Sequence, residues 1–233
     1  MEQVIHKADT RGYANHGWLE SYRSFSFAGY YNPQRMQFGT LRVLNDDRVA
    51  PGMGFGTHPH RDMEIISYVL DGALEHKDSM GNGSVIRPGD VQRMSAGTGV
   101  THSEYNHSST EPVHFLQIWL QPNAFGVEPG YDQKHFPIEE RHGQWVLLVS
   151  PDGHGGSIAT YQDALMFGTL LMPGESVDYR FEADRQGYLH LARGRLRVGE
   201  VILKQGDGLQ IRKHGVLELE GIEDAEVLLF DMP

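Results

Sequence analysis

The chain has 233 residues, which is enough for one large domain or two small ones with a substantial core. The formal net charge of -11 argues against a nucleic-acid binder, and the absence of cysteine excludes disulfides, thiolate metal ligands and a cysteine nucleophile. No apolar run approaches the roughly 20 residues of a membrane span, and the start of the chain has no apolar signal segment, so we expect a cytoplasmic protein without a membrane segment.

The first part of the chain is predicted to form short strands and turns. Residues 12–33 are rich in glycine, serine and aromatic residues and lack a helical period; core packing of the rings is favoured over a ligand-stacking surface. Residues 38–49 are predicted to be a strand that turns at Asn45-Asp46-Asp47, since these residue types favour turns. An acid/base role for the paired aspartates is the alternative.

The stretch that follows predicts an all-β architecture. From His58 to Leu70 both alternating faces become apolar after Glu64, which is typical of a strand buried on both sides. Further strands are expected at residues 74–78, 85–86, 91–94 and 113–120, separated by turns at 71–72 and 88–90 and by a hairpin at 80–83. This spacing indicates a β-sandwich or barrel. Residues 122–137 are predicted to be a linker.

The second half of the chain is predicted to repeat the first. The segment around Gly72 is echoed around Gly194, and the segment around Gly89 is echoed around Gly206. We therefore expect two copies of one β unit. The positions of the second copy that correspond to His58, His60, His102 and Glu104 are Arg180, Glu182, Leu219 and Gly221. No metal site is therefore expected in the second copy.

Two pairs of potential metal ligands stand at i and i+2 in the first unit: His58 with His60, and His102 with Glu104. Side chains at this spacing on a strand share one face, so both pairs can aim at one point. Three imidazoles and a carboxylate suit one divalent first-row metal: Fe²⁺ is expected, with Cu²⁺, Ni²⁺, Mn²⁺ or Zn²⁺ as alternatives. Glu64 shares the face of His58 and His60 by parity. A metal that only joins two strands is the competing interpretation of the cluster.

The residues around these pairs carry a resemblance to a known family. The stretches are His58-Pro59-His60-Arg61-Asp62-Met63-Glu64, Met94-Ser95-Ala96-Gly97-Thr98-Gly99-Val100, His102-Ser103-Glu104, Ser24-Phe25-Ser26-Phe27-Ala28 and Leu41-Arg42-Val43-Leu44-Asn45-Asp46-Asp47. Together they resemble the pirin family of the cupin superfamily over most of residues 10–122. The resemblance implies a bicupin of two jelly-roll barrels, with a metal-binding cupin domain at residues 1–130 and a degenerate cupin domain at residues 131–233.

The resemblance also implies a ligand set and a reaction. A standard cupin would take its carboxylate from Glu64, whereas the pirin pattern favours Glu104 and leaves Glu64 beside the ligands. The bacterial look-alikes are quercetin 2,3-dioxygenases, which implies a flavonol-like substrate and O₂, with Glu104 as the catalytic base and ring opening with release of carbon monoxide. A pirin-type regulatory protein that acts through a protein partner, and a non-oxidative cupin isomerase, are the alternatives.

Overall fold

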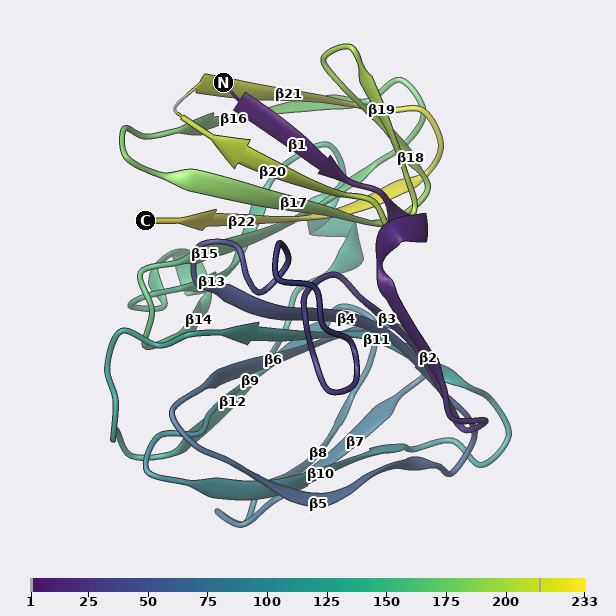
Figure 1. The fold of residues 1–233 in the computed structure, drawn as a ribbon, viewed down its shortest axis with the longest axis vertical. Helices are drawn as coiled ribbons and strands as arrows, with labels where there is room; N and C mark the ends of the chain where they lie inside the picture. The colour runs from purple at the N-terminus through teal and green to yellow at the C-terminus, as the bar shows by residue number, and fades with distance from the viewer. Residues whose placement is uncertain (1, 214) are drawn as a thin grey trace.

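The computed structural model describes residues 2–213 and 215–233. In these ranges the helices are short 3₁₀ segments: η1 (Ala8–Thr10), η2 (Ile138–Arg141) and η3 (His154–Gly156). None of them has the length and apolar character needed to cross a membrane. All other regular structure is β-strand, arranged as four sheets in two stacked units (Figure 1).

The N-terminal unit packs a seven-stranded sheet on a four-stranded one. The order in the large sheet is β12 (Gly130–His135), β9 (Asp90–Ser95), β6 (Glu64–Asp71), β11 (Val113–Leu120), β4 (Leu41–Val49), β3 (Leu19–Arg23), β2 (Gly12–Asn15). The order in the small sheet is β5 (Gly54–His60), β10 (Val100–Asn106), β7 (Leu74–Asp78), β8 (Gly83–Ile86). The predicted hairpin at residues 80–83 is therefore confirmed as the β7–β8 connection.

The C-terminal unit repeats this arrangement. The order in its large sheet is β1 (Glu2–His6), β20 (Gly208–Arg212), β17 (Gln186–Arg193), β22 (Ala225–Met232), β15 (Leu165–Leu171), β13 (Val146–Ser150), β14 (Ile158–Ala159). The order in its small sheet is β16 (Ser176–Phe181), β21 (Gly215–Gly221), β18 (Arg195–Val198), β19 (Val201–Lys204).

The predicted internal repeat is confirmed by this topology. The order β5-β10-β7-β8 matches β16-β21-β18-β19, and β9-β6-β11-β4 matches β20-β17-β22-β15. Gly72 and Gly194 close the equivalent β6–β7 and β17–β18 junctions, with φ of 77° and 79°. A Cβ on Gly194 would lie 2.0 Å from the carbonyl oxygen of Asp224, so glycine is required there. The all-β bicupin fold is thus confirmed.

Each large sheet takes its outer strand from a distant part of the chain. Strand β1 crosses to the C-terminal unit and pairs antiparallel with β20, while β12 pairs with β9 of the N-terminal unit (Figure 1). The prediction of a linker at residues 122–137 is wrong for residues 130–135, because an edge strand with one neighbour can be polar and largely exposed. The division of the chain at residues 130 and 131 stays a proposal.

The core has three layers: one inside each barrel and one between the two large sheets. Alternate residues of a strand in a large sheet point into different layers. In β6, Ile66 and Tyr68 face the C-terminal unit and join an apolar cluster shared by both large sheets, whereas Ile65 and Val69 belong to clusters inside the N-terminal barrel. The interior of the C-terminal barrel is filled by its own apolar cluster, which includes Leu217 and Leu219 of β21.

The predicted turn at Asn45-Asp46-Asp47 is wrong, because all three residues lie inside β4. Strands β3 and β11 pair with β4 on both sides and fix the extended backbone. The buried charge of Asp46 is compensated by Arg11 at 3.2 Å and by Nε2 of His114 at 2.7 Å. Asp46 faces the second unit, and the barrel cavity described below is lined by Asn45 and Asp47.

Candidate metal centre

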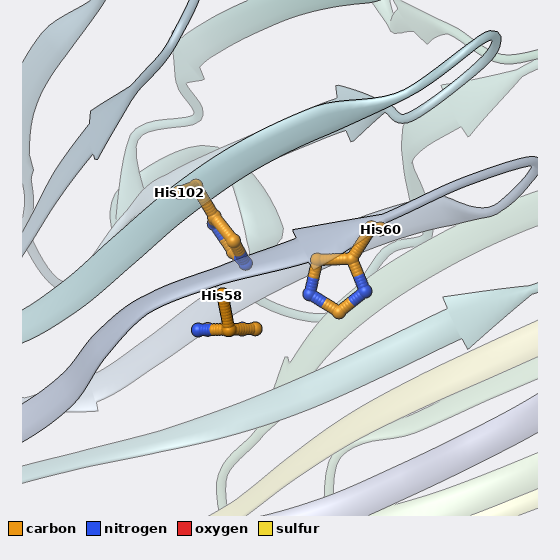
Figure 2. A group of neighbouring side chains, drawn as sticks. All are labelled: His58, His60 and His102. Atoms are coloured by element: carbon orange, nitrogen blue, oxygen red, sulfur yellow. The ribbon is translucent and has the colours of Figure 1, made fainter.

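Strands β5 and β10 bring three histidines together inside the N-terminal barrel. The two strands are antiparallel neighbours, with His102 directly opposite His58, and His60 follows two residues further on β5. One ring nitrogen from each of His58, His60 and His102 lies within 4.8 Å of the others. The rings converge on a common point (Figure 2), and the centroids of His58 and His102 are 4.5 Å apart. The predicted meeting of these three side chains is what the structure shows.

The protonation of the cluster suits a bound cation. The pKa of His60 is lowered to about 4 and that of His102 to about 2, in both cases mainly by burial and then by the charge of His58. The three rings are therefore not all protonated together near neutral pH. Nδ1 of His58 lies 2.7 Å from the carbonyl oxygen of Gly56, so the ring proton is on Nδ1 and the lone pair of Nε2 is available to bind a metal.

One atom of the cluster needs a partner that the protein does not supply. Nε2 of His102 is buried and makes no hydrogen bond with any described residue. Burying a polar nitrogen without a partner is unfavourable unless a ligand satisfies it. Neutral imidazole nitrogens are good ligands for divalent first-row metals, so the residues present fit such an ion.

Glu104 lies beside this group but is not a member of it. The alternation of β10 continues, and His102 and Glu104 are both buried. The β-bulge is in the pairing with β5, where His102 pairs with His58 and Glu104 with Phe55. The Glu104 carboxylate is fully buried; Ser67 donates a hydrogen bond of 3.0 Å to Oε1, and Gln117 donates one of 2.8 Å to Oε2. Burial raises the pKa of Glu104, and the bond from Ser67 only partly opposes this effect. Its role as a metal ligand stays a prediction.

Glu64 faces away from the histidines. Asp62, between β5 and β6, has a left-handed φ of 48°, which breaks the alternation on which the parity argument rested. The Glu64 carboxylate instead accepts hydrogen bonds of 2.8 Å from Ser95 and from Thr160 of the C-terminal unit. Glu64 therefore connects the two units of the protein.

A cavity of about 250 Å³ opens beside the histidine cluster, and His58 and His60 form part of its wall. Its apolar lining comes from Leu19, Phe27, Phe55 and Trp119. Its polar lining comes from Ser21, Arg23, Asn45, Asp47 and Gln117.

Four polar atoms of the cavity lining have no partner among the described residues: Nε of Arg23, Oδ1 of Asn45, Oδ1 of Asp47 and Nε1 of Trp119. Burial, together with the nearby charges of Asp46 and Glu104, raises the pKa of Asp47 to about 7, although a hydrogen bond from Ser21 opposes the rise. Of these residues, the sequence pattern marks only Asp47, through the acid/base alternative for the paired aspartates. The available signal was the i, i+2 spacing of Asn45 and Asp47 on one strand face.

Comparison with known proteins identifies the family. Residues 4–120 match the sequence profile of the family described as Pirin. The chain belongs to the pirin family. Residues 147–232 of this pirin match a second profile, described as the quercetinase C-terminal cupin domain. The family resemblance drawn from the histidine motifs is thus confirmed.

Relatives of this pirin are similar along their whole length. A protein of Escherichia coli (strain K12) named quercetin 2,3-dioxygenase is 44% identical over 98% of both chains. A pirin-like protein of Caulobacter vibrioides is 44% identical over 96% of both. The structure of the bacterial pirin YhhW from Escherichia coli in complex with nickel(II) is 44% identical, covers 100% of this chain and 99% of its own, and superposes with a TM-score of 0.95. A pirin relative of high similarity therefore binds a divalent first-row metal.

Proposed function

We propose that this pirin is a metal-dependent dioxygenase that opens the heterocyclic ring of quercetin-like flavonols and releases carbon monoxide. The observation that carries the proposal is the continuity of two features: His58 and His60 belong both to the histidine cluster and to the wall of the cavity beside it. A substrate in that cavity would lie next to a cation held by the cluster. The names of full-length relatives at 44% identity support the same class of reaction.

The proposed metal ligands are His58, His60 and His102, with Glu104 as the fourth. Fe²⁺ is the proposed metal; Ni²⁺ is the ion bound by the YhhW relative. When bound, the metal would supply a Lewis acid for the enolic oxygen of the substrate and a centre at which dioxygen reacts.

The chain's own side chains would handle the proton and the water. The raised pKa of Glu104 suits a base that accepts the proton of a flavonol enol, and the hydrogen bonds from Ser67 and Gln117 hold both of its oxygens in place. The apolar side of the cavity, including Phe27 and Phe55, would exclude water from the reacting ring.

The polar side of the same cavity would orient the substrate. Nε of Arg23 and Oδ1 of Asn45 are a donor and an acceptor without partners in the described part of the chain, and they can bind the carbonyl and hydroxyl groups of a flavonol. In the overall reaction the carbon that bears the enol oxygen leaves as carbon monoxide, and both atoms of dioxygen stay in the ester product.

The test is oxygen consumption and carbon monoxide release by metal-loaded protein with quercetin. Wild type is expected to consume one dioxygen for each carbon monoxide released, and His60→Ala should abolish both. His107→Ala is the matched control, because His107 follows the same strand β10 but lies exposed and bonds to Glu75 at 3.1 Å. The proposal fails if fully loaded wild type consumes no oxygen, or if His60→Ala retains wild-type turnover.

A further inference from the structure

Behind His102 lies a second pair of side chains that the metal cluster does not include. Strand β7 pairs with β10 on the side opposite β5, which places Asp78 across from His102 and His76 across from Glu104. His76 is fully buried, with Nδ1 3.5 Å from Nδ1 of His102 and Nε2 3.0 Å from Oδ2 of Asp78. The three residues thus form one chain of polar contacts that ends at the metal cluster.

The direction of each hydrogen bond in this chain follows from Asp78. Its carboxylate accepts hydrogen bonds from the backbone N–H groups of Met80 at 2.9 Å and Asn82 at 3.0 Å, and from the Asn82 side-chain amide at 2.9 Å. Although burial opposes ionisation, the hydrogen bonds from His76 and Asn82 keep the pKa of Asp78 below its usual value. An ionised carboxylate only accepts hydrogen bonds, so Nε2 of His76 is the donor.

The tautomer of His76 determines which nitrogen of His102 carries the proton. A neutral imidazole with its proton on Nε2 offers a lone pair at Nδ1. Nδ1 of His76 therefore acts as the acceptor, and Nδ1 of His102 carries the proton that is donated to it. Nε2 of His102 is left unprotonated, and this is the buried nitrogen that has no partner among the described residues.

The position of His76 is itself fixed by the surrounding structure. Its ring stacks on Tyr131 of β12, with centroids 4.8 Å apart and an interplanar angle of 30°. The Tyr131 hydroxyl contacts the Ser84 hydroxyl and donates a hydrogen bond of 2.8 Å to Gln133. The acceptor offered to His102 is therefore held by packing on one side and by an ionised carboxylate on the other.

We propose that His76 and Asp78 are positioning residues that hold His102 in the tautomer and orientation required to bind the metal. This inference rests on the proposed role of His102 as a ligand. Groups that orient a metal-bound imidazole in this way typically change metal affinity 10- to 100-fold when they are removed.

The test compares two variants of His76 whose new side chains have similar lengths. His76→Met removes both hydrogen bonds, whereas His76→Gln keeps an amide oxygen that can accept from His102 and an amide N–H that can donate to Asp78. Affinity for Ni²⁺ is measured by competition with a chelator, and the d–d absorption bands of the Co²⁺-loaded protein report the geometry at the metal. We expect about a 10- to 100-fold loss of affinity and shifted bands in His76→Met, and near wild-type values in His76→Gln.

The controls separate this role from a general loss of structure. His107→Met, in the exposed contact with Glu75, should leave both readouts unchanged. If His76→Met does not fold, Asp78→Asn takes its place, because it keeps the His76 ring on Tyr131 and only weakens its anchor; a several-fold loss of affinity is then expected. Wild-type affinity and bands in whichever variant folds would overturn the inference.

Both readouts use the metal alone, so they do not depend on the reaction. Protein that shows this pattern but consumes no oxygen with a flavonol would keep the inference and refute the proposed function. Oxygen consumption with a flavonol, together with equal Ni²⁺ affinity in His76→Met and His76→Gln, would support the proposed function and refute the inference. Absence of Ni²⁺ binding by wild type would refute both.

Discussion

Replacement of His190 by leucine is expected to stabilise the protein, and more so in acid. His190 lies in β17, and its side chain is fully buried where the C-terminal large sheet faces the N-terminal unit. Neither of its ring nitrogens has a hydrogen-bond partner among the described residues. Burying such a group costs about 1–3 kcal/mol, which the replacement removes. Leucine has a similar volume, and its imperfect packing would cost at most about 1.5 kcal/mol. At pH 7.5 the variant should therefore range from about 0.5 kcal/mol less stable to about 3 kcal/mol more stable.

The pH dependence of the stability gives a second, more specific prediction. Burial, reinforced by the charge of Arg11 and opposed by that of Asp46, lowers the pKa of His190 to about 3. The unfolded chain, with a histidine pKa near 6.5, binds the proton first as the pH falls, so wild type loses stability between about pH 6.5 and pH 3. At pH 5.5 this loss amounts to about 1.4 kcal/mol, and His190→Leu does not suffer it.

Urea denaturation of metal-free protein, followed by tryptophan fluorescence at pH 7.5 and pH 5.5, measures both effects. Removing the metal matters because its ligands also titrate. The stability difference between variant and wild type should grow by about 1.4 kcal/mol on going to pH 5.5. A constant difference, or a variant several kcal/mol less stable at pH 7.5, would show that His190 makes a favourable polar contact and would refute the reasoning.

Three further predictions follow from other polar contacts. Asp46→Asn should lower the free energy of unfolding by about 3–5 kcal/mol in urea at pH 7, because Arg11 and His114 lose a buried counter-charge. Although burial raises the pKa of Asp46, the hydrogen bond from His114 holds this pKa well below its usual range. The stabilisation by Asp46 is therefore lost as the pH falls below about 4. A variant as stable as wild type at pH 7 would contradict this prediction. Glu64→Gln should cost about 1.5–3 kcal/mol and leave Ni²⁺ affinity unchanged in chelator competition, whereas a large affinity loss would make Glu64 a ligand. Ni²⁺ at 100 times its Kd should stabilise wild type by about 2.7 kcal/mol in calorimetry and leave His102→Ala unaffected; equal stabilisation of both would exclude His102.

The histidine motifs could be interpreted from the sequence because their geometry is local. Alternation within one strand places His58 and His60 together, and the antiparallel pairing of β5 and β10 adds His102. The same alternation fails wherever the backbone departs from a regular strand. The left-handed Asp62 turns Glu64 to the other face.

Other features depend on contacts between residues far apart in the chain. Asn45-Asp46-Asp47 has the composition of a turn, and the contacts of Asp46 with Arg11, Arg48 and His114 make a buried strand acceptable there. Likewise, His76 acquires a role only because β7 is the neighbour of β10. No pattern within a short stretch of sequence contains that information.

The exchange of outer strands has a consequence for attempts to produce the halves separately. A fragment of residues 131–233 would lack Glu2–His6 and leave the edge of β20 uncovered, with a row of unpaired backbone groups open to self-association. It would also lose the hydrogen bond of 2.7 Å from the backbone N–H of Ala8 to Asp207. Gene truncation and bulky tags directly at the first residues would thus disturb the barrel opposite the histidines, and a peptide of residues 2–6 supplied in trans is the natural complement for such a fragment.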